Sequence, residues 1–325
     1  MKGTLLDIRL PATSANLGPG FDAAALAMDM YLHVQAVSAA QFSIAAEGRD
    51  EDICGNAKNH LILQTYGEVL SGEGKPVTPV HLHIENEIPI GKGCGSSAAA
   101  RLAGIVLAVR VGSLDWTDAR IIEEASRREH HPDNAAACWL GGVVVARMGE
   151  ERGDVQTAQI RPAQPWPLLL AISDQPFSTE EARRVLPAQY SRADAVANVQ
   201  NAMLLLAAFA QGRSELLNAT LGDRIHEPYR SSLCPLLPPL RELAGNDGIL
   251  GVALSGAGPS VLMFLEPQVP GERIKRTVAD HLKKRQLSAE LLLTSIAERG
   301  GASSMEPESA SSARKWSART SCQHK

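Results

Sequence analysis

The stretch that decides the fold is Pro89-Ile90-Gly91-Lys92-Gly93-Cys94-Gly95-Ser96-Ser97-Ala98-Ala99. It leads into a proline-free run of Ala, Leu, Ile and Val, which predicts a mostly buried helix from Ser97 to Val111. The three glycines let the backbone turn tightly and approach an anion without a Cβ in the way. Helix N–H groups and the positive end of the helix dipole face the same point, so this stretch predicts a phosphate loop. Its serines can bond phosphate or Mg²⁺, and Lys92 can add a charge.

Other interpretations of this loop stay open on the residues alone. The loop fits neither the GxxxxGK[ST] pattern of a Walker A loop nor the GxGxxG pattern of a Rossmann site. A nucleophile elbow at residues 95–99 lacks the closing glycine and an obvious ordered acid and base. The remaining alternative is a glycine-rich turn before a core helix, with no ligand.

A second polar segment, Glu129-His130-His131-Pro132-Asp133-Asn134, gathers acids, imidazoles and an amide. A carboxylate beside phosphates is the expected Mg²⁺ ligand, because Mg²⁺ prefers hard oxygen donors. Asp and Asn together can hold the ammonium and hydroxyl groups of a small substrate. A polar loop without a ligand is the alternative, and a zinc site is disfavoured because no HExxH or CxxC pattern accompanies the histidines.

Composition limits the class of protein. The chain has 325 residues, of which 44% are hydrophobic and 21% charged, and a net charge of −4. This length suits two domains, and the charge predicts no nucleic-acid partner. Five cysteines without CxxC spacing favour reduced thiols in a cytoplasmic protein. The N-terminus shows no apolar signal region, and no apolar run reaches about 18 residues, so we expect no membrane span.

The pattern along the chain predicts an α+β fold. Strands are expected at 5–11, 31–37, 42–46, 80–86, 142–147, 167–172, 249–255, 261–266 and 289–296. Helices are expected at 97–111, 117–128, 191–211, 214–221, 236–244 and 272–285, with a capping box at Ser178-Thr179-Glu180-Glu181 opening another. A polar stretch at 149–165 divides the chain into domains 1–155 and 156–298, and residues 299–325 have the composition of a disordered tail.

Two further glycine segments flank this framework: Pro11-Ala12-Thr13-Ser14-Ala15-Asn16-Leu17-Gly18-Pro19-Gly20-Phe21-Asp22 and Ser255-Gly256-Ala257-Gly258-Pro259-Ser260. With the phosphate loop between them, they resemble the GHMP kinase superfamily, and most closely its homoserine kinase branch. The resemblance covers residues 5–297. It implies an N-terminal domain like domain 2 of ribosomal protein S5, which binds ATP through residues 89–99, and a ferredoxin-like C-terminal domain. Cys94 stands where the family loop has leucine or methionine, a side chain of similar bulk.

The resemblance also implies roles for single residues. Ser97 and Glu129 are the implied Mg²⁺ ligands. The implied contacts of an amino-acid substrate are Asn16, Asp22, His131, Asp133 and Asn134. His130 replaces a family glycine, so if that position needs a positive φ, His130 is strained or the loop shifts.

The second half of the chain carries two more stretches of the family. Ser178-Thr179-x-x-Ala182-Arg183 implies Thr179 near the transferred phosphate and Arg183 at the substrate carboxylate. His226-Glu227-Pro228-Tyr229-Arg230 implies Arg230 as a second carboxylate partner, a role that suits the planar fork of arginine. Asn16, Lys92 and Thr179 are therefore the candidate catalytic residues, and no general base is implied.

Taken together, the resemblance implies a kinase that uses ATP and Mg²⁺ to phosphorylate the hydroxyl of L-homoserine, giving O-phospho-L-homoserine for threonine biosynthesis. Two alternatives stay open. One is another GHMP kinase, such as a mevalonate-type enzyme. The other is a non-catalytic GHMP-fold protein that binds nucleotide, with His130 and Cys94 as its first departures. The sequence leaves the oligomeric state open, a homodimer included.

Overall fold

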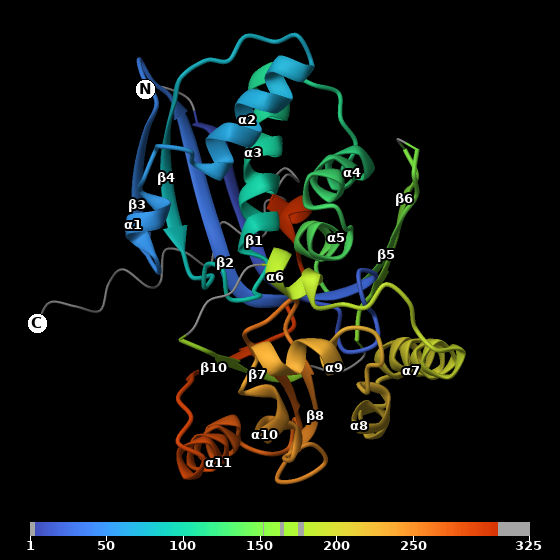
Figure 1. Ribbon diagram of the computed structural model, residues 1–325. Coiled ribbons are helices and arrows are strands. Elements are labelled where there is room, and N and C mark those ends of the chain that lie inside the picture. The colour runs from blue at the N-terminus through green and yellow to red at the C-terminus, as the bar shows by residue number, and fades with distance from the viewer. Residues whose placement is uncertain (1–3, 152, 163–165, 175–178, 305–325) are drawn as a thin grey trace, which may run out of the picture.

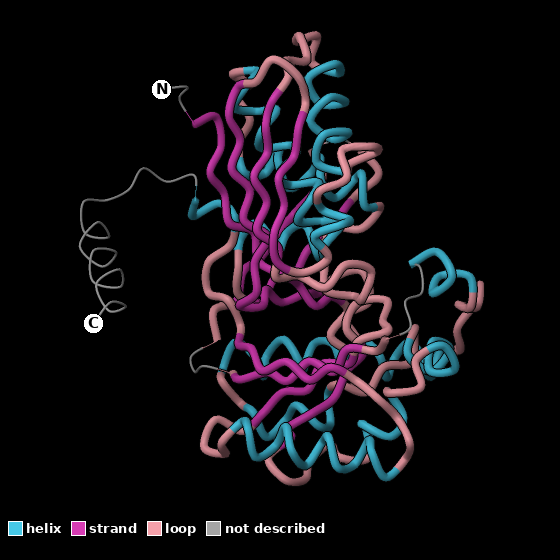
Figure 2. The backbone as a smooth tube through the Cα atoms, turned by 90° about the vertical axis from the view of Figure 1, so that its left-hand side faces the viewer, coloured by secondary structure: helices cyan, strands magenta, loops and turns pink. Residues whose placement is uncertain are grey.

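The structure, a computed structural model, describes residues 4–151, 153–162, 166–174 and 179–304. These residues form two sheets with their helices, one above the other in Figure 1 and, in a side view, Figure 2. The predicted α+β class is confirmed.

The first sheet is six-stranded, in the order β3-β4-β2-β5-β6, with β1 also paired to β2. Its strands are β1 (Thr4–Ala15), β2 (Ala24–Ser38), β3 (Ser43–Gly48), β4 (Val80–Asn86), β5 (Val143–Met148) and β6 (Val155–Ile160). Pairing is antiparallel throughout except between β3 and β4. Burial alternates along β2 and β4, so one face of the sheet is packed and the other is open.

Strand β6 lies inside the stretch that the sequence predicts as a linker. All six of its side chains are exposed or half-buried and three of them are polar, so it lacks the apolar signal of a core strand. It pairs with β5 and carries the first sheet past the predicted boundary at 155/156. The second sheet begins at Pro167.

Helices α2 (Leu61–Gly72), α3 (Ser96–Gly112), α4 (Asp118–Glu129) and α5 (Asp133–Leu140) lie on one side of the first sheet (Figure 1). A short helix, α1 (Glu51–Cys54), follows β3. The middle of α3, from Leu102 to Val109, is buried throughout, in agreement with its predicted apolar run. Gly104 lets α2 approach α3 closely, because a Cβ there would lie 2.5 Å from the carbonyl oxygen of Ile62. Helix α3 is therefore a rigid support for whatever its N-terminus binds.

The second sheet has four antiparallel strands in the order β10-β7-β9-β8. They are β7 (Pro167–Ile172), β8 (Ile249–Leu254), β9 (Val261–Leu265) and β10 (Glu290–Ser295). Helices α10 (Leu237–Arg241) and α11 (Gly271–Lys284) pack on it, and α6 (Thr179–Arg184), α7 (Arg192–Gln211), α8 (Leu217–Thr220) and α9 (Glu227–Arg230) complete this half. The turn between β8 and β9 points toward the first sheet (Figure 1).

Among the described residues, α7 is the one helix long and apolar enough to cross a membrane, by length and composition only. A single helix of this kind is weak support for a span. Its inner side joins the rest of the fold, since Leu205 and Phe209 are buried in the core. The side-chain amide of Asn198 also donates a 2.8 Å hydrogen bond to the carbonyl of Pro19.

The end of the described chain is packed rather than extended. A 3-10 turn, η3 (Gly301–Ser304), contacts β1 and α5, and Gly301 is buried. Ordered structure therefore continues beyond residue 299, where the sequence predicts the tail to begin. Residues 305–325 and Ser178, the predicted capping residue of α6, lie outside the described part of the chain.

Candidate active site

The three glycine segments, far apart in sequence, meet in the structure. The backbone N–H of Thr13 donates a 3.0 Å hydrogen bond to the carbonyl of Cys94, which joins the first segment to the loop. The hydroxyl of Ser255 donates to the carbonyl of Gly93 at 2.8 Å, which joins the third. The side-chain amide of Asn16 reaches the carbonyl of Gly256 at 2.7 Å. The fold thus assembles one site from both sheets.

A cavity of about 180 Å³ lies where the segments meet. The predicted site residues that line it are Asn16, Asp22, Gly91, Gly93, Cys94, Gly95, Ser96, Ser97, Glu129, His131, Asp133, Asn134, Arg183 and Arg230. Among the residues whose side chains the structure describes, Pro89, Ile90, Lys92, Ala98 and Ala99 do not line it, and the side chain of Thr179 lies outside that description. Ala98 and Ala99 are buried in α3, and Thr179 begins α6.

Lys92 turns away from the cavity. Its ammonium donates hydrogen bonds of 2.8 Å to the carbonyls of Ser173 and Asp174, at the end of β7. In this position it ties the loop to the second half of the chain. A phosphate contact for Lys92 stays a prediction that requires the side chain to leave these carbonyls.

Glycine is required in the loop for two separate reasons. Gly91, Gly93 and Gly95 all have φ between 70° and 75°, in the left-handed region. A Cβ on Gly95 would also lie 1.8 Å from the hydroxyl oxygen of Thr13. Gly95 caps α3, so the free N–H groups of its first turn open toward the cavity. Cys94 is buried in the core, where burial raises the pKa of its thiol to about 12, so it behaves as an apolar side chain.

We expect Gly95→Ala to lower stability by about 2–3 kcal/mol, because it combines an unfavourable φ with a clash against Thr13. The clash also moves the start of α3, so ATP affinity should fall by about tenfold. Chemical denaturation and nucleotide titration measure the two effects. Gly74→Ala is a matched control, since Gly74 also has positive φ but a Cβ added there would meet no atom within 4 Å, and it lies far from the loop in sequence. Equal losses in both variants would show that the clash with Thr13 contributes nothing.

Glu129, the last residue of α4, faces the start of α3. Its Oε1 accepts a 2.7 Å hydrogen bond from the hydroxyl of Ser97 and a 2.5 Å bond from Nε of Arg101. Ser97 and Glu129 both line the cavity beside the loop. Mg²⁺ prefers hard oxygen ligands, and the hydroxyl and carboxylate of this pair are ligands of that kind.

His130 stands where the resemblance expects a glycine, and it adopts the left-handed conformation. Its φ of 65° and ψ of 12° end α4 with an αL cap. A side chain with a Cβ pays about 1–2 kcal/mol in this region. His130 is exposed, so the loop accepts the cost without burying the imidazole, and His131 and Asp133 keep their places in the cavity lining.

We therefore expect His130→Gly to stabilise the protein by up to about 1 kcal/mol, because glycine adopts this cap without strain. Thermal unfolding should show a higher Tm, with homoserine and ATP kinetics little changed. His130→Ala is the informative comparison, since it removes the imidazole but keeps the Cβ. A rise in Tm for both variants alike would mean that the imidazole, and not the backbone conformation, is the source of strain.

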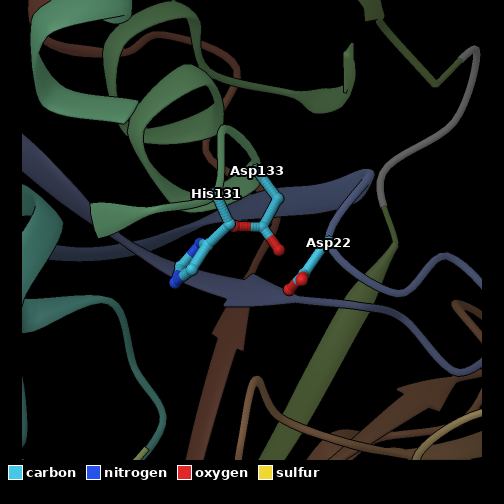
Figure 3. Close-up of side chains that lie close together, drawn as sticks. All are labelled: Asp22, His131 and Asp133. Atoms are coloured by element: carbon cyan, nitrogen blue, oxygen red, sulfur yellow. The ribbon is translucent and has the colours of Figure 1, made fainter. Parts of the chain in front are cut away.

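Two carboxylates and an imidazole converge on one side of the cavity (Figure 3). Ligand atoms of Asp22, His131 and Asp133 all lie within 4.8 Å of one another. Nδ1 of His131 is 2.6 Å from Oδ1 of Asp133, which also accepts the backbone N–H of Asn134 at 2.6 Å. Burial lowers the pKa of His131, but the bond to Asp133 and the neighbouring negative charges outweigh it, so the net shift is upward. This corner of the cavity favours a cation.

Two arginines face that acidic corner. Arg183 forms a bidentate pair with Asp22, at 3.0 and 2.7 Å, and is about one-third exposed. Arg230 is buried, and its Nε donates to the carbonyl of Ala182 at 3.0 Å. Both guanidinium groups lie over the ring of Phe21, at 5.5 and 5.2 Å from its centroid. Burial, and next the charge of Arg183, lowers the pKa of Arg230 to about 10, so it stays cationic at neutral pH.

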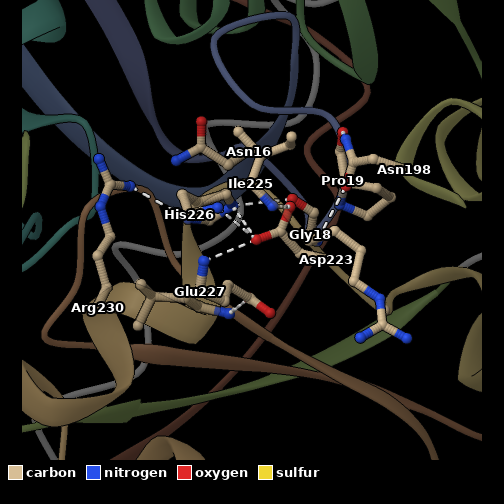
Figure 4. Close-up of polar contacts among 12 residues, drawn as sticks. Asn16, Gly18, Pro19, Asn198, Asp223, Ile225, His226, Glu227 and Arg230 are labelled. Carbon is tan, nitrogen blue, oxygen red and sulfur yellow. Dashed lines mark hydrogen bonds and ion pairs between the residues drawn. The ribbon is translucent and has the colours of Figure 1, made fainter. Parts of the chain in front are cut away.

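His226 holds Arg230 in place (Figure 4). Its Nε2 lies 2.8 Å from the carbonyl of Gly18, so Nε2 carries the proton, and Nδ1 accepts from Arg230 at 3.2 Å. If Nδ1 were protonated, its N–H would face an N–H of Arg230, and neither group could accept the hydrogen bond. Burial, and the positive charge of Arg230, lower the pKa of His226 to about 4, although the carboxylate of Asp223 acts in the opposite direction.

This shift predicts a specific loss of stability in acid. Between pH 6.5 and about 4 the unfolded chain protonates His226 and the folded protein does not, so the free energy of unfolding falls as the pH falls. The expected loss is about 3 kcal/mol by pH 4. We expect His226→Gln to be less stable at pH 7 but to lose less in this range. Urea unfolding across pH measures it, and parallel profiles for the two proteins would contradict the assignment.

A second cavity, of about 580 Å³, adjoins the first and shares Gly91, Ser96 and Ser97 with it. Its apolar lining comes from Leu32, Ile53, Leu61, Ile62, Ile84, Ile88 and Ile90, and its polar lining includes Asn56, Lys58, Asn59 and His60. Nδ1 of His60 is buried and has no hydrogen-bond partner among the described residues. Burial lowers the pKa of His60.

Residues 60–142 match the GHMP kinases N terminal domain, and residues 205–284 match the GHMP kinases C terminal domain. The chain is 42% identical over 293 residues to the homoserine kinase of Solibacter usitatus, an alignment that covers 90% of this chain and 95% of that one. The chain belongs to the homoserine kinases. The homoserine kinase of Desulfitobacterium hafniense is 36% identical, with 92% of this chain and 99% of that one covered.

Solved structures agree on the fold. A crystal structure of homoserine kinase from Cytophaga hutchinsonii superposes with a TM-score of 0.78 at 23% identity, over 92% of this chain and 97% of that one. The mevalonate kinase of L. major, solved with R-mevalonate, gives a TM-score of 0.67 at 14% identity, over 91% and 98%. The predicted homoserine kinase branch and two-domain GHMP fold are therefore confirmed.

Three residues of this homoserine kinase site were missed by the sequence analysis. Phe21 was quoted in the first segment without a role, although an aromatic ring between turn residues was a visible signal. His226 was quoted only as part of a motif. Arg101 carried no signal beyond its spacing of one helical turn from Ser97.

Proposed function

We propose that this protein transfers the γ-phosphoryl group of ATP to the hydroxyl of L-homoserine, giving O-phospho-L-homoserine for threonine biosynthesis. The observation that carries the proposal is the juxtaposition of the phosphate loop with the Asp22–Arg183 pair in one cavity. An α-amino acid carries an ammonium and a carboxylate side by side. It can therefore replace this internal ion pair with two pairs of its own.

The proposed substrate pose uses the charges already present. The ammonium lies between Asp22 and Asp133, whose oxygens are close enough to share one cation. The carboxylate binds Arg183 and Arg230, which Phe21 keeps on the same side. The side-chain hydroxyl then extends toward the phosphate loop. Asn16 fixes this pocket, since its Oδ1 accepts the N–H of Asp22 at 3.0 Å while its amide holds Gly256.

For ATP, we propose that the adenosine occupies the larger apolar cavity and the phosphates cross the shared residues Gly91, Ser96 and Ser97. Ser97 and Glu129 would hold Mg²⁺, which when bound neutralises charge on the phosphate oxygens. The chain supplies the N–H groups at the start of α3 and aligns the hydroxyl, because phosphoryl transfer depends mainly on positioning and charge.

We further propose that the protein works in the cytoplasm, which is supported by four buried free thiols among the described cysteines. We assign no general base. Thr179 stays a proposed neighbour of the transferred phosphate, in keeping with its position at the start of α6.

The test is ADP release from Mg·ATP with L-homoserine, D-homoserine, L-serine and mevalonate as acceptors. We expect rapid turnover with L-homoserine alone. Turnover with mevalonate would favour another GHMP kinase activity. Nucleotide binding without turnover of any acceptor would favour a non-catalytic binding protein and overturn the proposal.

A further inference from the structure

Arg101 lies on the helix that follows the phosphate loop and contacts Glu129, although it lines neither cavity itself. It follows Ser97 by one turn of α3, so both side chains lie on one helix face, and helix side chains lean toward the N-terminus. Nε of Arg101 and Oγ of Ser97 both contact Oε1 of Glu129, at 2.5 and 2.7 Å. The guanidinium group therefore lies beside a residue that lines the cavity.

The contacts to Glu129 are one-sided. Both donors reach Oε1, and Oε2 takes part in neither bond. Glu129 is mostly buried, with 11% of its side chain exposed, against 25% for Arg101. Burying a carboxylate is costly unless it is paired, and Arg101 is the cationic partner of Glu129 at this place.

We propose that Arg101 is a positioning residue that clamps one oxygen of Glu129 and sets the charge of the metal site. Its fixed positive charge weakens binding of a free divalent cation and strengthens binding of the nucleotide phosphates. The inference rests on the proposed role of Glu129 as a metal ligand. Arg101 is then a permanent positive charge beside the metal ion that binds with the nucleotide.

Removing Arg101 has two opposing effects on the metal. Loss of the clamp lets the side chain of Glu129 move, and because metal binding must then order that side chain, the affinity for the metal falls a few-fold. Loss of the guanidinium removes repulsion between a monovalent and a divalent cation that share one carboxylate, which is worth tenfold or more at this depth of burial. Repulsion wins, so the free metal binds more tightly without Arg101. For ATP without metal, the sign is reversed, because attraction to the phosphates is lost.

The experiment uses the full chain and two binding measurements without catalysis. Mn²⁺ binding to the nucleotide-free protein is followed by electron paramagnetic resonance, and ATP binding in EDTA by calorimetry. For Arg101→Gln we expect Mn²⁺ affinity to rise and metal-free ATP affinity to fall, each on the order of tenfold. Arg101→Lys keeps the charge but not the Nε contact, so both constants should stay within a few-fold of wild type. High salt should shrink both effects.

Two further variants separate the possible failures. Arg128→Gln removes the pairs of Arg128 with Glu124, at 2.8 Å, and with Glu68; none of these residues lines either cavity, so it should change neither constant. If Glu129→Gln binds Mn²⁺ like wild type, the proposed metal role of Glu129 fails. If Glu129→Gln loses Mn²⁺ but Arg101→Gln leaves both constants unchanged, or moves them in one direction, the inference about Arg101 is overturned alone. Should Arg101→Gln fold poorly, the Arg101→Lys constants decide, because a tenfold change there contradicts a role set by charge.

Discussion

Glu129→Gln is expected to lower kcat/KM by about 10³-fold while the protein stays folded. The substitution keeps the shape of the side chain and its bond to Ser97 but removes the negative charge that the metal needs. Arg101 loses its charged partner, which lowers the free energy of unfolding by about 1 kcal/mol or more. Steady-state kinetics over a range of Mg²⁺ should show a raised Mg²⁺ requirement together with a lowered kcat.

Glu124→Gln provides the matched control. Glu124 lies on the same helix and pairs with Arg120 and Arg128, at 3.3 and 2.8 Å, but takes no part in the cavity lining. It should retain near-normal turnover. If Glu129→Gln also retained near-normal turnover at low Mg²⁺, the metal would have to be held elsewhere, and the acidic corner of Asp22 and Asp133 would be the next candidate.

Asp22→Asn is expected to raise the KM for L-homoserine by about 100-fold, because it leaves the substrate ammonium without one of its two carboxylates. The KM for ATP should change little, since Asp22 pairs with Arg183 and does not line the larger cavity proposed for the adenosine. The variant also releases Arg183 from its bidentate pair, so the affinity for a carboxylate alone should not fall.

A second substrate makes this prediction sharper. The compound 4-hydroxybutanoate is homoserine without its ammonium, so wild type should strongly prefer homoserine and Asp22→Asn should lose most of that preference. Asp154→Asn is the matched control, because Asp154 forms a similar pair with Arg147 at 3.1 Å on the surface. A preserved preference in Asp22→Asn would show that Asp133 alone recognises the ammonium.

Much of the fold could be predicted from the sequence, because the local residue pattern favours the same elements as the packing of the folded chain. Strands β4 and β7 have the predicted bounds, since each is a short apolar or alternating run with clear ends. Helix α3 follows from its proline-free run. Helix α2 was not predicted: its residues include Thr65, Tyr66 and Gly67, and contact with α3 across Gly104 overrides that weak propensity.

Helix α5 was missed for a different reason. Its first turn holds Asp133 and Asn134, which favour loops and caps when considered singly. Residues 129–134 were predicted as a candidate site, with a polar loop as the alternative, and no helix was predicted there, although Ala135 to Trp139 are buried core residues. Strand β6 was missed because a strand with mostly exposed side chains gives no apolar alternation.

The site was predictable as far as its residues belong to motifs. The structure brings Asp22, Asp133, Arg183 and Arg230 into one cavity, and it also shows that Arg183 is paired with Asp22. Lys92 illustrates the limit, since a lysine in a phosphate loop suggests a phosphate contact, while its ammonium lies on the carbonyls after β7. Arg101 could not be found without knowing that the end of α4 lies beside the start of α3.

Because hydrogen bonds join the three glycine segments, the two halves of the chain are not independent domains. Ser255 in the second half donates to the carbonyl of Gly93 in the first, and Asn16 in the first half donates to the carbonyl of Gly256 in the second. Opening either sheet therefore dismantles the cavity wall supplied by its neighbour. A ligand held in that cavity stabilises both halves at once, so saturation with substrate should convert any stepwise melting of the two domains into a single cooperative transition.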